Sequence, residues 1–422
     1  MQKLLIRGGS KLRGDIRLQG SKNSALPILA AAYMCHGQSV LRNCPELTDI
    51  YAASRILNHL GCKSTFKDNT VIISQSDFQC SVITEKLMGE MRSSIIFLGA
   101  MLGIHKKCVV GYPGGCKLGP RPIDMHIDAF RRMGADISED SGRITCIVHG
   151  KIHGAKINLE FPSVGATENI MLCAVLADGE TVINNAAREP EIQDLADFLR
   201  RCGAKISGDG DSRIVIQGVK ELRGCEYEIM PDRIAGATYL SAVAGAGGEI
   251  ILRDSCIAAM EPFISVLDST GCSIYSSEND IYLRSGTRLK AIKNPIRTMP
   301  HPGFPTDAQA VLMAALTKSY GTSVFEENIF DCRYQHTDAL VKMGANIKVI
   351  SKTAIVQGVT NLYGAPVEAT DLRGGAAMVI AAIMAEGQSS ISNISHIDRG
   401  YEKIEKYFSQ LEADIRRTDD SE

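Results

Sequence analysis

The stretch Met133-Gly134-Ala135-Asp136-Ile137 decides the fold, because its pattern returns along the whole chain. The other copies are Leu60-Gly61-Cys62-Lys63, Cys202-Gly203-Ala204-Lys205-Ile206, Thr270-Gly271-Cys272-Ser273-Ile274, Met343-Gly344-Ala345-Asn346-Ile347 and a degraded Leu411-Glu412-Ala413-Asp414-Ile415. From Gly61 onward the copies are 73, 69, 68, 73 and 68 residues apart. An amphipathic run precedes each copy, so each one predicts a helix that ends at a glycine and is followed by a strand.

A second pattern repeats with the same period, in which a polar or Gly-rich cluster opens a run of small apolar residues. The openings are Ser21-Lys22-Asn23, Met91-Arg92-Ser93, Val164-Gly165-Ala166-Thr167, Pro231-Asp232-Arg233, Pro305-Thr306-Asp307 and Leu372-Arg373-Gly374. The runs that follow are apolar nearly all round, which predicts helices buried on every side. Pro27 is expected in the first turn of its helix, where proline is tolerated.

Six copies of both markers indicate six repeated units of about 70 residues. Each unit is predicted to contain a strand, a buried helix, a strand, an amphipathic helix and a strand pair. Six units are too many residues for a single hydrophobic core, so we expect an α/β protein with two similar domains of three units each. One helix per unit should lie inside each domain, with the sheets and the amphipathic helices outside.

The composition is that of an ordinary globular protein: 422 residues, 45% hydrophobic, 22% charged and a net charge of −2. No global basic field points to nucleic acid. The N-terminus reaches Gly8 too early for a secretory signal, and the most apolar runs, 95–104 and 378–384, are too short to span a membrane. We therefore expect a cytoplasmic protein without nucleic-acid or membrane partners.

No metal or nucleotide-cofactor motif is present. The thirteen cysteines are odd in number and scattered, without a Cys-x-x-Cys pair, and no histidines have metal-ligand spacing. The chain also lacks a Walker loop and a Gly-x-Gly-x-x-Gly helix start. We expect no cofactor and no metal.

Basic residues mark the start of several buried helices, where unpaired N–H groups favour anions. They are Lys22, Arg92, Arg233 and Arg373, and further arginines follow later strands: Arg121, Arg333 and Arg399. A surface ion pair is the simpler explanation for any one of them. Their recurrence at equivalent places favours a site for a polyanionic small molecule in a cleft between the two domains.

The segment from Gly111 to Pro122 contains four glycines and three prolines, which predicts a loop. Cys116 lies in its middle beside Lys117 and Arg121, and nearby positive charge favours a thiolate. Alone, the segment is equally explained as a surface turn with an incidental cysteine. The two markers of this unit are 42 residues apart, against 38 or 39 in the others. We interpret the excess as an insertion that places a thiol over the basic cleft and acts as a lid.

Asp307 stands at a tight turn into a helix, and it has two interpretations. The first interpretation is that Asp307 caps the helix N-terminus, and the sequence alone favours it. The second is that Asp307 acts as a general base. Asp232 has the same two interpretations, while Asp371 and Glu189 are weaker acidic candidates. His126, after the loop, is expected to be structural or next to a substrate.

The chain resembles the enolpyruvyl transferases over essentially its whole length. The segments that carry the resemblance are Gly20–Pro27, Met91–Ile95, Gly114–Asp124, Ser163–Thr167, Ala187–Glu191, Gly303–Asp307 and Asp398–Tyr401. The Gly114-Gly115-Cys116 loop is similar to that of the branch that acts on UDP-N-acetylglucosamine. The sister enzyme for shikimate 3-phosphate shares the sixfold architecture but not this loop.

The resemblance implies two inside-out α/β barrels around a cleft, with residues 22–231 in one domain and 1–21 plus 232–422 in the other. It also implies transfer of enolpyruvate from phosphoenolpyruvate to the 3'-hydroxyl of UDP-N-acetylglucosamine by addition and elimination, with release of phosphate. That reaction is the first committed step of peptidoglycan synthesis, and hence of cell-wall growth, cell shape and division. In this family the epoxide fosfomycin alkylates the loop cysteine.

The resemblance further assigns roles to individual residues. Catalytic roles fall to Cys116 as proton donor, to Asp307 as base, and to Lys22 and Arg399. Phosphoenolpyruvate would contact Lys22, Asn23, Arg121 and Arg399. UDP-N-acetylglucosamine would contact Arg92, Arg121, Pro122, Ile123, Asp124, Met125, Ser163, Val164, Gly165, Ala166, Asp307 and Ile329. Supporting residues would be Asp232, Arg233, Arg373 and Glu189. The chain departs from the family at Phe161-Pro162, where some members carry a basic residue, and at Cys332, where asparagine is usual.

Three alternatives stay open. The first is the shikimate 3-phosphate enzyme of the same fold. The second is a catalytically silent repeat protein that binds anions. The third is an RNA 3'-phosphate cyclase-like nucleotidyl transferase, which would need a nucleotide-accepting histidine that the sequence does not reveal. The oligomeric state is also open.

Overall fold

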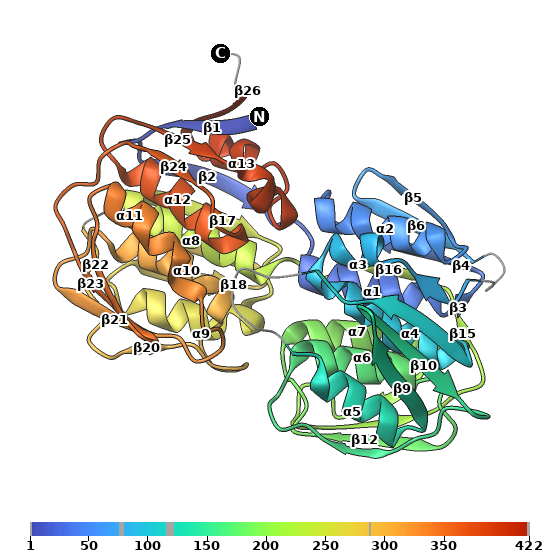
Figure 1. Cartoon of the computed structure of the whole chain (residues 1–422). Helices are drawn as coiled ribbons and strands as arrows, with labels where there is room; N and C mark the ends of the chain where they lie inside the picture. The colour runs from blue at the N-terminus through green and yellow to red at the C-terminus, as the bar shows by residue number, and fades with distance from the viewer. Residues whose placement is uncertain (1, 76–79, 115–121, 287, 420–422) are drawn as a thin grey trace. The chain divides into compact units, whose positions relative to one another are not determined.

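The structure is a computed structural model that describes residues 2–75, 80–114, 122–286 and 288–419 (Figure 1). The described chain divides into two compact units. One unit contains the residues up to Gln19 and those from Pro231 onward, and the other contains the described residues from Gly20 to Met230. Each unit is an α/β domain with helices inside and sheets outside, so the predicted two-domain α/β fold is confirmed.

In the part of the Gly20–Met230 unit that the structure describes, three buried helices and three outer helices are present. The buried ones are α1 (Lys22–Tyr33), α4 (Ile96–Ile104) and α6 (Val164–Ala174), and the outer ones are α2 (Thr48–His59), α5 (Asp124–Arg132) and α7 (Pro190–Arg201), with the short α3 (Glu85–Gly89) and η1 (Arg92–Ile95). Its strands are β3 (Cys35–His36), β4 (Gln38–Arg42), β5 (Lys63–Lys67), β6 (Thr70–Ser74), β7 (Val82–Ile83), β8 (Lys107–Gly111), β9 (Ala135–Asp140), β10 (Arg143–Val148), β11 (Lys156–Asn158), β12 (Glu180–Asn184), β13 (Lys205–Ser207), β14 (Arg213–Gln217), β15 (Leu222–Arg223) and β16 (Glu226–Glu228).

The other unit, which holds both ends of the chain, repeats this arrangement. Its buried helices are α8 (Arg233–Ala246), α10 (Thr306–Leu316) and α12 (Leu372–Met384), and its outer helices are α9 (Ile257–Asp268), α11 (Thr337–Lys342) and α13 (Ile404–Gln410), with η2 (Arg333–His336) and η3 (Ile394–Arg399). Its strands are β1 (Gln2–Arg7), β2 (Leu12–Arg17), β17 (Gly248–Arg253), β18 (Ser273–Ser277), β19 (Asp280–Ser285), β20 (Ile296–Arg297), β21 (Thr322–Glu326), β22 (Asn346–Ile350), β23 (Thr353–Gln357), β24 (Pro366–Glu368), β25 (Gln388–Ser392) and β26 (Asp414–Asp419).

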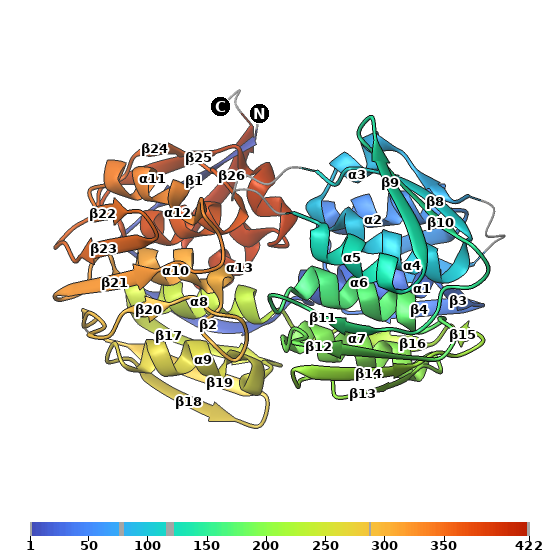
Figure 2. The same cartoon turned by 60° about the horizontal axis from the view of Figure 1, so that its bottom comes forward.

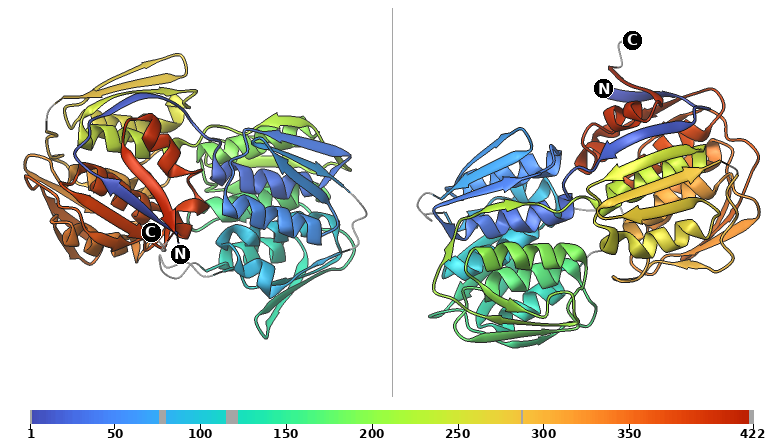
Figure 3. Two further views of the ribbon diagram at one scale, coloured as in Figure 1. Left: turned by 90° about the horizontal axis from the view of Figure 1, so that it is seen from above. Right: turned by 180° about the vertical axis from the view of Figure 1, so that it is seen from behind.

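One strand pattern recurs in the four-stranded sheets of both units. A short outer strand lies parallel to its neighbour and the next two pairings are antiparallel, as in the order β11-β12-β14-β13. The two N-terminal strands, β1 and β2, each belong to a sheet whose other strands come from much later in the sequence. β1 lies between β25 and β26, antiparallel to both, and β2 lies parallel to β17 (Figure 3). The beginning and the end of the chain therefore belong to one sheet.

The buried helices of each unit pack against one another, as their composition predicts. In α12 every residue from Arg373 to Met384 is buried, and Figure 2 shows α8, α10 and α12 lying between the sheets of their unit. Small residues allow this close packing. A Cβ atom added to Gly245 of α8 would lie only 3.1 Å from Cα of Ala315 in α10 and 2.6 Å from Sδ of Met384 in α12. No larger side chain fits there without a shift.

The repeated glycines lie where the outer helices end, as predicted. Gly61, Gly134, Gly203, Gly271 and Gly344 have positive φ angles of 100°, 96°, 106°, 95° and 96°. After α7 the N–H groups of Gly203 and Ala204 donate to the carbonyls of Arg200 and Leu199, at 3.0 and 2.9 Å, which is a Schellman motif. The sixth copy has the same motif with Glu412 at the left-handed position, at φ 65°.

The expectation for Pro27 is wrong. Helix α1 begins at Lys22, so Pro27 is its sixth residue and lies beyond the first turn. Proline has no N–H, so the carbonyl of Asn23 lacks its usual helical donor. The burial of α1 against its neighbours outweighs this local cost, and Pro27 itself is buried.

Glu412→Gly is expected to stabilise the unit that contains it. A left-handed conformation costs a non-glycine residue about 1–2 kcal/mol, and glycine gives back about 0.5–1 kcal/mol of this through its greater freedom in the unfolded chain. The free energy of unfolding should rise by about 0.5–1 kcal/mol, measured by urea denaturation.

Gly203→Ala is the converse control, because a Cβ added at Gly203 meets no atom within 4 Å and so tests the backbone alone. It should lower the free energy of unfolding by about 1 kcal/mol. A loss of stability in Glu412→Gly would show that the Glu412 side chain contributes more than its backbone conformation costs.

Candidate active site

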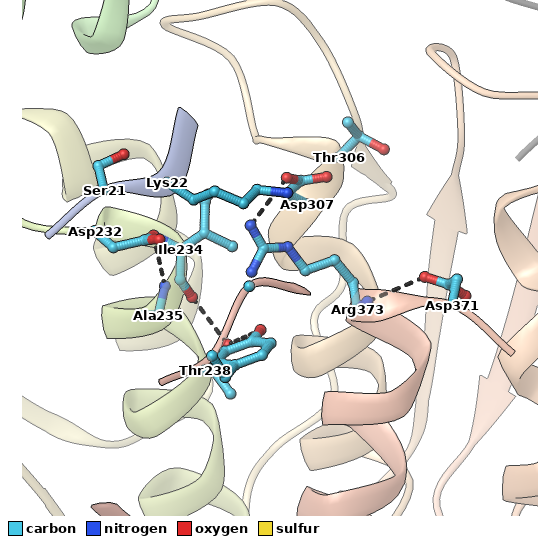
Figure 4. Close-up of polar contacts among 12 residues, drawn as sticks. Ser21, Lys22, Asp232, Ile234, Ala235, Thr238, Thr306, Asp307, Asp371 and Arg373 are labelled. Carbon is cyan, nitrogen blue, oxygen red and sulfur yellow. Dashed lines mark hydrogen bonds and ion pairs between the residues drawn. The ribbon is translucent and has the colours of Figure 1, made fainter. Parts of the chain in front are cut away.

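Asp307, in the first turn of α10, is bound by two buried arginines. Its Oδ1 accepts from Nη2 of Arg333 at 3.0 Å. Its Oδ2 accepts from Nη2 of Arg373 at 3.2 Å, and this second contact is drawn in Figure 4. The two arginine side chains are 2% and 3% exposed, whereas that of Asp307 is 29% exposed. The N-cap position belongs to Pro305, so the N-cap interpretation of Asp307 is wrong. Two guanidinium groups stabilise its negative charge instead.

The two arginines are held by further contacts of their own. Arg333 also donates from Nη2 to the carbonyl oxygen of Thr306 at 3.0 Å. The guanidinium carbon of Arg373 lies 5.3 Å from the ring centre of Tyr401. Burial would lower the pKa of Arg373, but Tyr401 and Asp307 together raise it above its ordinary value. These contacts hold both guanidinium groups in place beside the Asp307 carboxylate.

Asp232 and Asp371 are N-caps of the neighbouring buried helices (Figure 4). Asp232 accepts from the backbone N–H groups of Ile234 and Ala235 at 2.9 and 3.0 Å, and Asp371 accepts from those of Arg373 and Gly374 at 3.0 and 3.1 Å. The capping interpretation of Asp232 is thus confirmed. Each cap satisfies donors that the first turn of a helix leaves unpaired.

The other candidates of this unit lie near the same helix starts. Arg233 is the first residue of α8 and is buried, and Arg399 is the last residue of η3 and is half-buried. Ile329 is half-buried in the segment that follows β21.

His336 is a buried titratable group that the sequence did not single out. Its side chain is 0% exposed, and its Nδ1 lies 3.2 Å from the carbonyl oxygen of Arg333. Burial, opposed by the charge of Asp371 and assisted by that of Arg333, lowers the pKa of His336 to about 4. The ring is therefore neutral at neutral pH.

In the unit from Gly20 to Met230, Lys22 and Asn23 are the first two residues of α1. Ser21 caps this helix by accepting from the N–H of Ser24. The Nζ atom of Lys22 lies 3.4 Å from Oδ2 of Asp49, and the two side chains are 14% and 4% exposed. Asp49 thus fixes the amine of Lys22 at the start of the helix.

Asp194 of α7 holds the same helix turn from the other side. Its carboxylate accepts from the hydroxyl of Ser24, from the hydroxyl of Tyr227 at 2.6 Å and from the N–H of Met230 at 3.3 Å. Burial raises the pKa of Asp194, although the hydrogen bonds from Ser24 and Tyr227 oppose the rise. The sequence offered no signal for this contact, because its partners come from three distant segments.

Two predicted acceptor-binding segments adjoin one another in this unit. Pro122 and Ile123 lead into α5, whose first two residues are Asp124 and Met125. Ser163 is the N-cap of α6 and accepts from the N–H of Ala166 at 3.3 Å. His126 of α5 joins them. It is buried, its Nδ1 lies 2.8 Å from Nδ2 of Asn169 in α6, and a Cβ added to Gly165 would lie 3.5 Å from its ring. His126 therefore has a structural role.

Arg92 and Glu189 are placed at two further helix starts. Arg92 is the first residue of η1, which leads into α4, and it is half-buried. Glu189 occupies the N-cap position of α7 without a side-chain cap bond. Burial, and then repulsion from Glu191 and Glu189, raises the pKa of the neighbouring Glu168 well above its ordinary value. Glu168 is a charged residue in a helix whose other residues are all uncharged, and this could have been noticed in the sequence.

Cys116 and Arg121 lie outside the described residues, as does most of the loop that was interpreted as a lid. Among the described residues, no three His, Cys, Asp or Glu side chains are grouped so that they could hold a metal ion. Within that same part of the chain, no helix is long and apolar enough to cross a membrane.

Comparison with known proteins assigns the family. Residues 6–408 match the family model described as EPSP synthase (3-phosphoshikimate 1-carboxyvinyltransferase). The chain belongs to this family of enolpyruvyl transferases. It is 46% identical over 417 residues to UDP-N-acetylglucosamine 1-carboxyvinyltransferase 2 of Caldanaerobacter subterraneus subsp. tengcongensis, covering 99% of this chain and 100% of the relative. It is 43% identical over 418 residues to UDP-N-acetylglucosamine 1-carboxyvinyltransferase of Nitratidesulfovibrio vulgaris, covering 99% of both.

Solved structures show the same fold. The enolpyruvyl transferase NikO from Streptomyces tendae superposes with a TM-score of 0.89 at 22% identity, over 99% of both chains. EPSP synthase from Acinetobacter baumannii superposes with a TM-score of 0.78 at 18% identity, over 99% of this chain and 100% of that one. These matches support the two-domain architecture.

His336 is expected to make stability depend on pH. Its pKa is lower in the folded protein than the ordinary value of about 6.5, so the unfolded chain binds the proton more readily. Stability is therefore lost as the pH falls from about 6.5 to about 4, by roughly 3 kcal/mol in total. The measurement is the free energy of unfolding of this unit between pH 7 and pH 4.

His336→Asn is the matched variant, because asparagine retains a donor near the position of Nδ1 and does not titrate. Its stability should fall less steeply over the same pH range. Equal slopes in the wild type and the variant would contradict the assignment.

Proposed function

We propose that the chain transfers enolpyruvate from phosphoenolpyruvate to the 3'-hydroxyl of UDP-N-acetylglucosamine and releases phosphate. The observation that carries this proposal is the identity of 46% and 43%, over nearly the full chain, to relatives named for that reaction. The Gly114-Gly115-Cys116 sequence is further support, because the sister enzyme for shikimate 3-phosphate does not share it. Family membership alone is consistent with either acceptor.

The proposed donor site lies at the start of α1. Phosphoenolpyruvate carries a phosphate and a carboxylate, which suit helix N-termini and paired cations. Lys22 and Asn23 are the first residues of that helix, and Asp49 holds the Lys22 amine in place. We assign donor binding to Lys22, Asn23, Arg121 and Arg399.

The proposed reaction uses one acid and one base. Cys116 donates its proton to the methylene carbon of phosphoenolpyruvate, while Asp307 takes the proton of the sugar hydroxyl as its oxygen bonds to the adjacent carbon. Elimination follows when the bond from that carbon to the phosphate oxygen breaks and the new methyl group returns a proton to the thiolate. The proton that Asp307 took from the hydroxyl leaves with the phosphate, so both residues return to their starting states. Lys22 and Arg399 stabilise the charge that develops.

We assign acceptor binding to a set of residues by family resemblance. They are Arg92, Arg121, Pro122, Ile123, Asp124, Met125, Ser163, Val164, Gly165, Ala166, Asp307 and Ile329. Arg373 supports this site through its ion pair with Asp307, and Asp232 supports it by capping α8. Arg233 and Glu189 are assigned supporting roles from their places at two helix starts.

We also propose the setting of the reaction. Both substrates are charged metabolites that do not cross a bilayer unaided, so we place the enzyme in the cytoplasm. There it would perform the first committed step of peptidoglycan synthesis and so supply cell-wall growth, cell shape and division. No cofactor is required by the proposed steps.

Phosphate release should require phosphoenolpyruvate and UDP-N-acetylglucosamine together. The measurement is inorganic phosphate in the presence of each compound alone, of both, and of phosphoenolpyruvate with shikimate 3-phosphate. If phosphate is released with shikimate 3-phosphate and not with UDP-N-acetylglucosamine, the proposal is wrong and the chain catalyses the sister reaction.

Cys116→Ser should lose most turnover, at least about a hundredfold, because a hydroxyl is a much weaker proton donor than a thiol under these conditions. It should also lose all labelling by fosfomycin, measured by mass spectrometry of the intact chain. Cys332→Ser is the matched control, because Cys332 is exposed and has no proposed role. Fosfomycin bound to another cysteine in the Cys116→Ser variant would refute the assignment.

A further inference from the structure

Glu327 is a buried carboxylate directly after β21 that accepts hydrogen bonds from two separate segments. Its side chain is 1% exposed. The hydroxyl of Thr306 donates to it, at 3.1 Å from Oε1 and 3.0 Å from Oε2. The N–H groups of Ile329 and Phe330 donate to Oε1 at 2.9 and 3.0 Å. A carboxylate buried this deeply is stable only when such donors surround it.

These partners adjoin the residues assigned to the acceptor site. Thr306 is the first residue of α10 and directly precedes Asp307, and Ile329 is itself an assigned contact. Thr306 and Glu327 are 21 residues apart in the sequence. One carboxylate therefore fixes the start of α10 against the segment after β21.

The backbone around Asp307 is held from two sides. Glu327 binds the hydroxyl of Thr306, while Arg333 binds its carbonyl oxygen at 3.0 Å and the Asp307 carboxylate at 3.0 Å. The backbone N–H of Glu327 is anchored in turn to the carbonyl oxygen of Lys352 at 2.8 Å. Thr306, the residue that precedes Asp307, is thus held through its hydroxyl by Glu327 and through its carbonyl oxygen by Arg333.

We propose that Glu327 is a positioning residue for the nucleotide-sugar acceptor. It touches neither substrate, and it holds the Asp307 carboxylate and the Ile329 backbone at a set spacing. This role rests on the proposed function. It adds a residue that supports binding of the acceptor and has no effect on binding of phosphoenolpyruvate. A misplacement of these groups of about 1 Å is enough to reduce catalysis strongly.

Glu327→Ala and Glu327→Gln distinguish positioning by hydrogen bonds from an effect of charge. Alanine leaves three partly buried donors without this acceptor, so the KM for UDP-N-acetylglucosamine should rise about tenfold to a hundredfold. The KM for phosphoenolpyruvate should stay within about twofold. Glutamine keeps one oxygen for the two N–H groups and can donate its amide hydrogen to Thr306, so its kinetics should stay within about threefold of wild type.

Two further variants complete the experiment. Thr306→Val removes one hydroxyl with little change of shape, and it should raise the same KM by a few fold even if Glu327→Ala does not fold. Glu326→Gln is the matched control, because Glu326 is the neighbouring residue, 30% exposed, and pairs with Arg297. It should leave both KM values unchanged.

Equal changes in both KM values, or no change in Glu327→Ala and Thr306→Val, would overturn the positioning role. Hydrogen exchange separates this outcome from failure of the proposed function. If the wild type does not turn over these substrates, the function fails, but the amides of Ile329 and Phe330 should still lose protection in Glu327→Ala and keep it in Glu327→Gln. Protection that persists in Glu327→Ala would overturn the positioning role independently.

Discussion

The burial of one helix on all sides in every repeated unit is the constraint on which the rest of the structure depends. A helix with no solvent face is built mainly from apolar residues, as α12 is from Gly374 to Met384. Its first turn still has N–H groups that need acceptors. In α8 and α12 an aspartate supplies them, and in α1 and α6 a serine does. The polar residues of the chain are thus drawn to the helix starts.

The electrostatics of the unit that contains Asp307 follow from this burial. Arg333 and Arg373 are almost completely removed from water, and an isolated buried charge costs several kcal/mol. Asp307 offsets that cost for both, so its carboxylate is held by two ion pairs rather than used as a cap. A group fixed in this way is pre-organised, which is what a catalytic base or a substrate contact requires. The same logic applies to Lys22, whose amine is held by the nearly buried Asp49.

Much of the fold could be predicted because its signals are local. A glycine at the end of an amphipathic run requires a positive φ angle, and a run of small apolar residues requires burial, wherever either stands in the chain. The places of β1 and β2 could not be predicted in this way. β2 pairs with β17, more than two hundred residues later, and short strands carry little information about their partner. Pro27 shows the same limit, since tertiary packing tolerates it in the interior of α1.

For the candidate site, the sequence by itself determined the repeated units, the helix starts and the kinds of residue gathered there. Only the tertiary structure decided which acidic residue became a cap, which became an ion-pair partner and which became a buried support. Asp307 meets arginines that follow it by 26 and 66 residues, and Glu327 meets a threonine 21 residues before it. The physical reason is that helix ends depend on neighbouring residues, whereas the partner of a buried charge depends on which elements pack together.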